Sequence, residues 1–176
     1  MLIDRSITVG RPRAEVYQFW RAFENFPRFM QHLKSVRAAD ERGMRSHWVA
    51  KAPLDKDVEW DSEITADRPN EMIAWRSLPG SQIQNSGTVQ FKDAPGNRGT
   101  EIYVTLEYDP PGGNAAALVA RMLGEEPEKQ IHDDLRRFKQ IMEVGTIATV
   151  TGQSSGRKDD VEKERSTLSG IKETSR

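Results

Sequence analysis

Three histidines are the side chains best suited to proton transfer near neutral pH. They are His32, His47 and His132, and no two of them lie within four residues of each other. Because local histidine motifs for metals need shorter spacing, the sequence predicts no metal site. His47 is the best acid–base candidate by type, but it alternates with Trp48 along an expected strand. It therefore faces solvent if Trp48 faces the core, and no catalytic residue is assigned.

The other two histidines have plainer interpretations. His132 stands beside Asp133 and Asp134 in an expected helix, which is typical of a charged helix surface. His32 follows a short helical segment and is a candidate cap for it. No serine lies in a nucleophile elbow, and no glycine-rich loop fits a phosphate cradle.

Four carboxylates alternate with apolar or small residues in a clear strand pattern at residues 57–65. They are Asp57, Glu59, Asp61 and Glu63. Their spacing suggests either a metal or acid–base cluster or one solvated strand face. Strict period-two alternation puts all four on the same exposed face, so we favour the solvated face.

Polar side chains in the remaining strands could orient a ligand. Ser62 and Asn85 share the phase of apolar neighbours and could bond a carbonyl or hydroxyl group. Arg76 has two possible positions: it faces inward if Trp75 faces outward, where it would need an anionic or carbonyl partner, and it is a surface residue in the opposite phase. Tyr108 ends an alternating strand on its inward side.

Composition excludes several classes of protein. The chain has 176 residues, enough for one domain with a core, and a net charge of -1, which gives no general attraction for nucleic acid. There is no cysteine, so disulfides and thiolate chemistry are excluded. No apolar run approaches the roughly 20 residues of a membrane span, and no secretory signal is visible. We expect a soluble cytoplasmic protein without a cofactor.

The elements that must position these side chains are mostly strands. Period-two patterns predict seven of them, at residues 2–9, 32–40, 44–51, 57–65, 72–77, 83–92 and 100–108. Two short helices packed through aromatic residues are expected after the first strand, starting at Pro12 and Pro27. A long helical run covers residues 112–145, and Gly124 and Pro127 divide it. This order predicts an α+β fold in which an antiparallel sheet curls round the last helix.

The last segment of the chain differs in composition. Residues 152–176 begin with a linker-like stretch and continue with mixed charges and no aromatic residue. Such a segment cannot bury enough surface to offset its ordering entropy. We predict a folded domain at residues 1–151 and a disordered charged tail at 152–176.

Several motifs resemble a known family. They are the opening Val16-Tyr17-Gln18-Phe19-Trp20 and Phe26-Pro27-Arg28-Phe29-Met30, then Trp60, Ile73-Ala74-Trp75-Arg76-Ser77, Gly87-Thr88-Val89-Gln90-Phe91, Gly99-Thr100-Glu101 and Asp134-Leu135-Arg136-Arg137-Phe138-Lys139. Together they resemble the polyketide cyclase/dehydrase group of the START-like (SRPBCC, helix-grip) superfamily, over residues 2–151. The resemblance implies a seven-stranded antiparallel sheet round a long C-terminal helix, with an elongated apolar cavity between them.

The expected cavity is lined by inward strand faces and the start of the long helix. Small residues there, Ala117 and Ala120, would leave room beside the cavity. The candidate ligand-binding residues are Trp48, Trp60, Ser62, Trp75, Arg76, Asn85, Gly87, Val89, Phe91, Leu106, Tyr108, Leu118 and Met122.

Three functions are compatible with this pattern. We favour binding or transfer of an apolar small molecule, such as a lipid, a quinone or a polyketide-like compound. The alternative is a cyclase or dehydratase acting in the same cavity. A third is an interaction module that uses the charged tail on a partner.

Overall fold

The strands follow the expected order. The computed structural model describes residues 1–51, 56–109 and 115–145, which all belong to one compact unit. Its seven strands are β1 (Leu2–Val9), β2 (Leu33–Ala38), β3 (Arg45–Ala50), β4 (Val58–Arg68), β5 (Met72–Ser77), β6 (Gln84–Asp93) and β7 (Thr100–Asp109).

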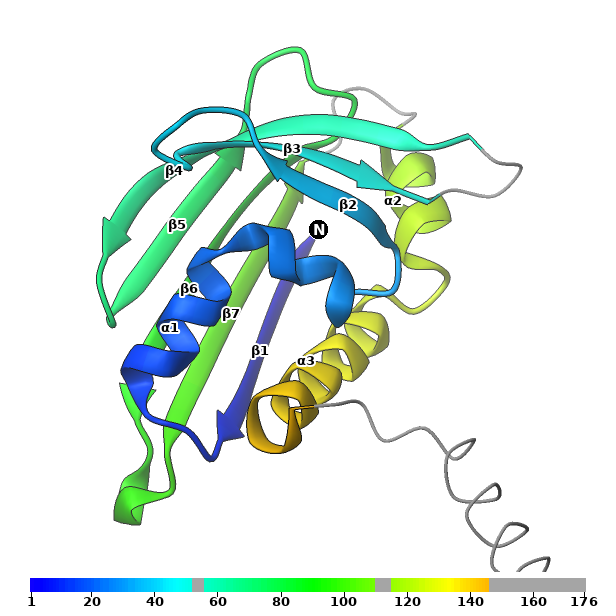
Figure 1. Cartoon of the computed structure of the whole chain (residues 1–176). Coiled ribbons are helices and arrows are strands. Elements are labelled where there is room, and N and C mark those ends of the chain that lie inside the picture. The colour runs from blue at the N-terminus through cyan, green and yellow to red at the C-terminus, as the bar shows by residue number, and fades with distance from the viewer. Residues whose placement is uncertain (52–55, 110–114, 146–176) are drawn as a thin grey trace, which may run out of the picture. The chain divides into compact units, whose positions relative to one another are not determined.

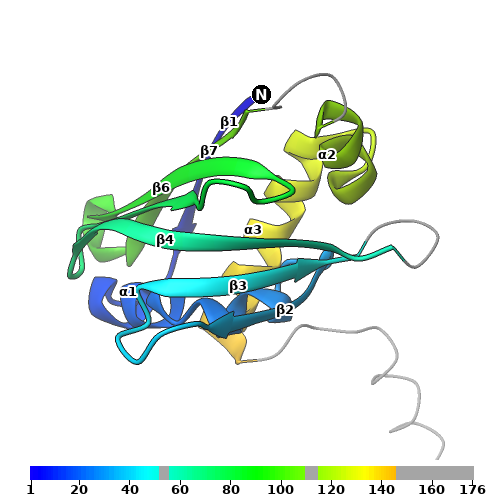
Figure 2. The same ribbon diagram turned by 90° about the horizontal axis from the view of Figure 1, so that it is seen from above.

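These strands form one antiparallel sheet in the order β1-β7-β6-β5-β4-β3-β2. Every pair except β1–β7 joins strands that are consecutive in the chain, and the β1–β7 pair places the first strand beside the last. The sheet curves strongly, and the helix after β1 and the last helix lie on its concave side (Figures 1 and 2). Strand alternation sends one set of side chains toward those helices and the other toward solvent.

The helices between β1 and β2 differ from expectation. Helix α1 covers Arg13–Arg21, and a 3-10 helix, η1, covers Phe23–Arg28. Pro27 lies inside η1 and does not begin a second helix, which corrects the predicted start. Trp20 and Phe26 are buried, so this region is part of the core, as the aromatic pattern predicts.

The C-terminal helical run is divided where the sequence places its glycine and proline. Helix α2 covers Ala115–Leu123 and helix α3 covers Pro127–Val144. Gly124 between them has φ +82°, a conformation that side chains rarely adopt, so the break requires glycine. Helix α3 buries one face, with Ile131 and Phe138 among the most buried side chains, and this is the face that the sheet surrounds.

Polar contacts fix both α3 and α1 to the sheet. Lys139 of α3 donates to the carbonyl of Thr8 in β1 at 2.6 Å. Tyr17 of α1 donates to Oδ1 of Asp67 in β4 at 2.5 Å, and Arg21 Nε donates to the other oxygen at 2.7 Å. Burial, and then the hydrogen bond to Asp67, raise the pKa of Tyr17 to about 12, so this hydroxyl stays a donor.

The structure confirms the predicted fold class. A seven-stranded curled antiparallel sheet holds a C-terminal helix, with short helices after β1. No helix among the described residues is long and apolar enough to cross a membrane. The predicted boundary at residue 151 and the tail at 152–176 lie outside the described residues.

Candidate functional site

A cavity lies between the concave face of the sheet and the first half of α3. Its volume is about 40 Å³. Strands β2 to β7 all contribute to its wall, together with η1, the loop after it and α3. The lining residues are Phe26, Met30, His32, Leu33, Trp48, Trp60, Ser62, Trp75, Asn85, Leu106, Tyr108 and Ile131. Most of this wall is apolar, and much of it is aromatic.

Strand register builds the aromatic wall. Trp48 of β3 stands directly opposite Trp60 of β4, and their rings stack with centroids 5.7 Å apart and an angle of 17°. Phe26 of η1 packs edge-on against Trp48 with centroids 5.5 Å apart. Aromatic pairs of this kind contribute about 0.5–1.5 kcal/mol beyond their buried area. The wall is therefore rigid where these three rings meet.

Ser62 places an unpaired hydroxyl in this apolar wall. Its Oγ is buried and has no hydrogen-bond partner among the described residues. The other buried serines are paired: Ser46 accepts from Trp48 Nε1 at 2.8 Å, and Ser77 exchanges hydrogen bonds with the backbone of Asn85. An unpaired buried polar group costs about 1–3 kcal/mol. A ligand that bonds Ser62 would recover that energy.

His32 and Asp134 form a second polar feature beside the cavity. His32 Nδ1 lies 3.6 Å from Asp134 Oδ2, and both atoms are buried without a hydrogen-bond partner among the described residues. The other oxygen of Asp134 accepts from Arg137 at 2.7 Å and from Gln130 at 3.0 Å. Arg137 thus compensates a fully buried carboxylate, and His32 extends from that carboxylate to the cavity wall.

Tyr108 is the remaining ionisable group in the lining. Burial and then the negative charge of Asp134 raise the pKa of its hydroxyl far above its ordinary value. The hydroxyl therefore stays protonated at every physiological pH and can donate a hydrogen bond to a ligand.

Seven of the thirteen sequence-predicted ligand residues line the cavity. They are Trp48, Trp60, Ser62, Trp75, Asn85, Leu106 and Tyr108. They come from five neighbouring strands, β3 to β7, and the alternation that predicted their inward phase holds in each of them.

The other strand candidates lie elsewhere. Arg76 is on the outer face, where its side chain is 63% exposed and pairs with Glu63 at 2.7 Å, which corrects its assignment to the cavity. Gly87 is buried beneath Trp75 and contributes no lining. Phe91 packs against Tyr17 and Trp20 of α1, and Val89 is fully buried in the core; neither residue lines the cavity.

The helix candidates also differ from expectation. Met122 is buried but does not line the cavity. Ala117 and Ala120 are exposed, so they leave no room beside the cavity as predicted. Leu118 lies outside the residues whose side chains the structure describes.

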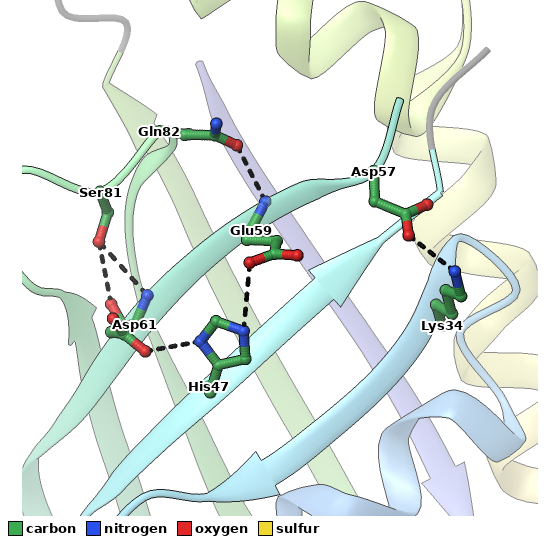
Figure 3. A network of polar contacts seen from close by, with 7 residues as sticks. All are labelled: Lys34, His47, Asp57, Glu59, Asp61, Ser81 and Gln82. Carbon is green, nitrogen blue, oxygen red and sulfur yellow. Dashed lines mark hydrogen bonds and ion pairs between the residues drawn. The ribbon is translucent and has the colours of Figure 1, made fainter. Parts of the chain in front are cut away.

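A separate polar network covers the outer face of β3 and β4. His47 lies between Asp61 and Glu59 of β4 (Figure 3). Its Nδ1 is 2.8 Å from Asp61 Oδ1, and its Nε2 is 3.5 Å from Glu59 Oε2. His47 therefore faces outward, as predicted. The acidic alternation of β4 is a solvent-facing ion-pair surface, and no group of three or more ligands for a metal occurs among the described residues.

Sequence reasoning missed His32 and the buried role of Asp134. His32 does not cap η1, whose C-terminal cap is the backbone N–H of Phe29 bonded to the carbonyl of Phe26, and it lines the cavity instead. Asp134 follows the buried Ile131 by three positions in α3, about one helical turn. This spacing was the signal in the sequence that placed Asp134 on the apolar face of the helix.

Comparison with known proteins agrees with this architecture. A 17.2 kDa protein of Streptomyces lincolnensis is 28% identical over 144 residues, which are 80% of this chain and 89% of that protein. The crystal structure of DR_A0006 from Deinococcus radiodurans is 41% identical, with a TM-score of 0.66, over 82% of this chain and 99% of that one.

A third similarity shows the fold alone. The di-domain ARO/CYC protein BexL, from the BE-7585A biosynthetic pathway, is 19% identical with a TM-score of 0.58, over 80% of this chain and 47% of that one. The family model described as "Polyketide cyclase / dehydrase and lipid transport" matches residues 9–136, most of the folded chain. The family match and the seven-stranded sheet around α3 agree, and the chain belongs to the polyketide cyclase/dehydrase and lipid transport family.

Proposed function

We propose that this protein binds an apolar small molecule that carries a hydroxyl or carbonyl group. The observation that carries the proposal is the unpaired Ser62 hydroxyl in a cavity lined by three tryptophans. Ligand sites in proteins are commonly apolar and aromatic, with a few polar groups that fix orientation. The family's lipid-transport description supports the same class of ligand. A cytoplasmic location stays a prediction.

The size of the cavity sets a condition on binding. About 40 Å³ holds one or two water molecules, whereas drug-sized ligands occupy about 300–1,000 Å³. A lipid or a multi-ring compound therefore requires the walls to separate. Met30 is an adaptable part of the wall, because methionine has three rotatable bonds and packs in many shapes.

Filling the cavity tests this function. Ser62→Leu removes the unpaired hydroxyl and adds an apolar side chain at the same point of the wall. We expect it to abolish binding of any small molecule that native mass spectrometry finds on the purified protein, with no loss of folding. Ser86→Leu is the matched control, because Ser86 alternates with Gly87 and lies on the opposite face of β6.

The result has a clear negative outcome. Protein that carries no small molecule after purification, and whose tryptophan fluorescence is unchanged by lipids, quinones and aromatic ketones, does not have this function. Equal ligand retention in the Ser62→Leu and Ser86→Leu variants would place the ligand outside the cavity.

A second candidate function is cyclisation and dehydration of a poly-β-keto chain in the same cavity. The observation that favours it is the polar set formed by Ser62, Asn85 and Tyr108 in the apolar wall. The family description names the same chemistry. Turnover of a poly-β-keto substrate that falls in Tyr108→Phe would support it, and unchanged turnover would exclude a catalytic role for that hydroxyl.

A further inference from the structure

His32 and Asp134 are brought together from distant parts of the chain. One lies just before β2 and the other lies on α3. Their side chains are 8% and 0% exposed, and their facing atoms are 3.6 Å apart, slightly beyond a hydrogen bond. Buried polar atoms in native proteins are nearly always paired, so this gap calls for an explanation. A small movement of His32 toward α3 closes it.

Asp134 is held in a fixed orientation. Arg137 and Gln130 both donate to its Oδ1, which leaves Oδ2 directed at His32. A carboxylate facing Nδ1 favours the tautomer that carries its proton there. The second ring nitrogen, Nε2, is then a hydrogen-bond acceptor, and among the described residues the side-chain interaction of His32 is the one between Nδ1 and Asp134, which leaves Nε2 available to a ligand.

The other groups around His32 leave it as the proton acceptor of the cavity. Tyr108 of β7 and Ser62 of β4 line the same space, and each carries a hydroxyl. The raised pKa of Tyr108 keeps it a donor. Among the described residues, no lysine, arginine or carboxylate lines the cavity, and Arg137 is already bonded to Asp134. A bound molecule with an acidic proton therefore meets one basic atom and two hydroxyl donors.

We propose that His32 accepts the proton of an acidic hydroxyl on the bound ligand, such as that of a phenol, and that Asp134 stabilises the imidazolium that results. The ligand O–H bond breaks, its electron pair stays on oxygen, and an N–H bond forms at Nε2. The phenolate oxygen then accepts hydrogen bonds from Tyr108 or Ser62, and the proton returns on release. This inference rests on the proposed function, because it requires a ligand in the cavity.

Two probes of similar shape separate proton transfer from simple burial. The first is 4-nitrophenol, whose phenolate absorbs at longer wavelength than the phenol, and the second is its methyl ether, 4-nitroanisole, which has no proton to give. At a pH below the pKa of the free phenol, we expect the wild-type protein to bind 4-nitrophenol with a phenolate band. We expect about tenfold weaker binding of 4-nitroanisole, since a shift of about one pKa unit toward the bound phenolate corresponds to that factor.

Variants identify the residues. His32→Gln and Asp134→Asn should each remove the phenolate band and weaken 4-nitrophenol binding about tenfold, while 4-nitroanisole binding stays unchanged. The retained binding of 4-nitroanisole shows that the cavity is intact, which a merely structural role for either residue would not allow. His132→Gln is the matched control, because His132 lies on the exposed face of α3, and it should behave as wild type.

Each other outcome overturns the inference. A phenolate band that persists in both variants would assign the proton to another group. Equal binding of the two probes without a band would show that no proton moves, although the proposed function would stand. Failure of both probes, together with an empty protein by native mass spectrometry, would remove the proposed function as well.

Discussion

Gly87 makes a specific prediction because Trp75 lies against it. The two residues are opposite each other in the β5–β6 pair. A Cβ atom on Gly87 would lie 2.4 Å from Trp75 Cζ2, 2.8 Å from Trp75 Cε2 and 2.9 Å from the carbonyl oxygen of Thr105. Real Cβ atoms essentially never approach other atoms this closely, so Gly87→Ala must displace the indole ring.

The direction of that displacement is toward the cavity. Trp75 is 7% exposed, its ring packs against Phe23 with centroids 6.1 Å apart, and it lines the cavity. Overpacking a core by one methyl group costs about 1–3 kcal/mol. The cavity of about 40 Å³ can accept part of the ring, which favours the lower half of that range. We expect Gly87→Ala to lose about 1–2 kcal/mol of unfolding free energy and to fill the cavity.

Urea unfolding and ligand retention measure the two effects. Gly10→Ala is the control, because its Cβ would approach only the side chain of Glu143, at 3.2 Å, whose flexible end can move. Adding Trp75→Phe removes the ring atoms that clash, so Gly87→Ala should cost less in that background, with a coupling of about 1 kcal/mol. A Gly87→Ala protein with wild-type stability and ligand retention would refute the steric argument.

Two other substitutions test contacts away from the cavity. Tyr17→Phe removes the hydrogen bond to Asp67 and should cost about 1–2 kcal/mol by urea unfolding at neutral pH. The pKa of Tyr17 rises from 10.0 to about 12 on folding, so the free energy that its hydroxyl adds to the folded state is complete below pH 10 and falls as the pH rises toward 12. A difference in stability between the wild type and Tyr17→Phe that stays constant across this range would contradict the assignment. Arg76→Ala breaks an exposed ion pair with Glu63, so it should leave ligand retention unchanged and alter stability by less than about 1 kcal/mol; loss of the ligand would return Arg76 to the binding site.

The sheet could be predicted from the sequence because its alternation is regular. In β4, Val58, Trp60 and Ser62 face inward while Glu59 and Asp61 face solvent, and period-two patterning alone separates them. The same rule left Arg76 undecided, since it depends on the phase of Trp75. Only the register against Ser86 and Gly87 in β6 decides that phase.

The cavity could be predicted only in part, because its polar end depends on contacts between distant segments. His32 lies in a loop, where no periodicity gives the direction of a side chain. Asp134 belongs to a helix with charges on both sides of it, and its burial follows from its partners Gln130 and Arg137, one turn away on either side. The small residues Ala117 and Ala120 misled the prediction, because small size in a helix is compatible with exposure as well as with a neighbouring cavity.

The concave side of the sheet is divided into a filled part and a hollow part, and the helices after β1 explain the division. Trp20 of α1 fits between Phe29, Phe91 and Phe138, with centroid distances of 5.2–6.5 Å, so that part is interlocked and almost fully buried. Helix η1 ends at Arg28, and the chain then turns into β2. The described cavity lining includes Phe26 of η1 and no residue of α1, so no aromatic side chain of α1 fills the space in front of Ser62. The closely packed aromatic rings are concentrated in the interlocked part, whereas the hollow part keeps the unpaired Ser62 hydroxyl and the buried His32–Asp134 pair at its wall.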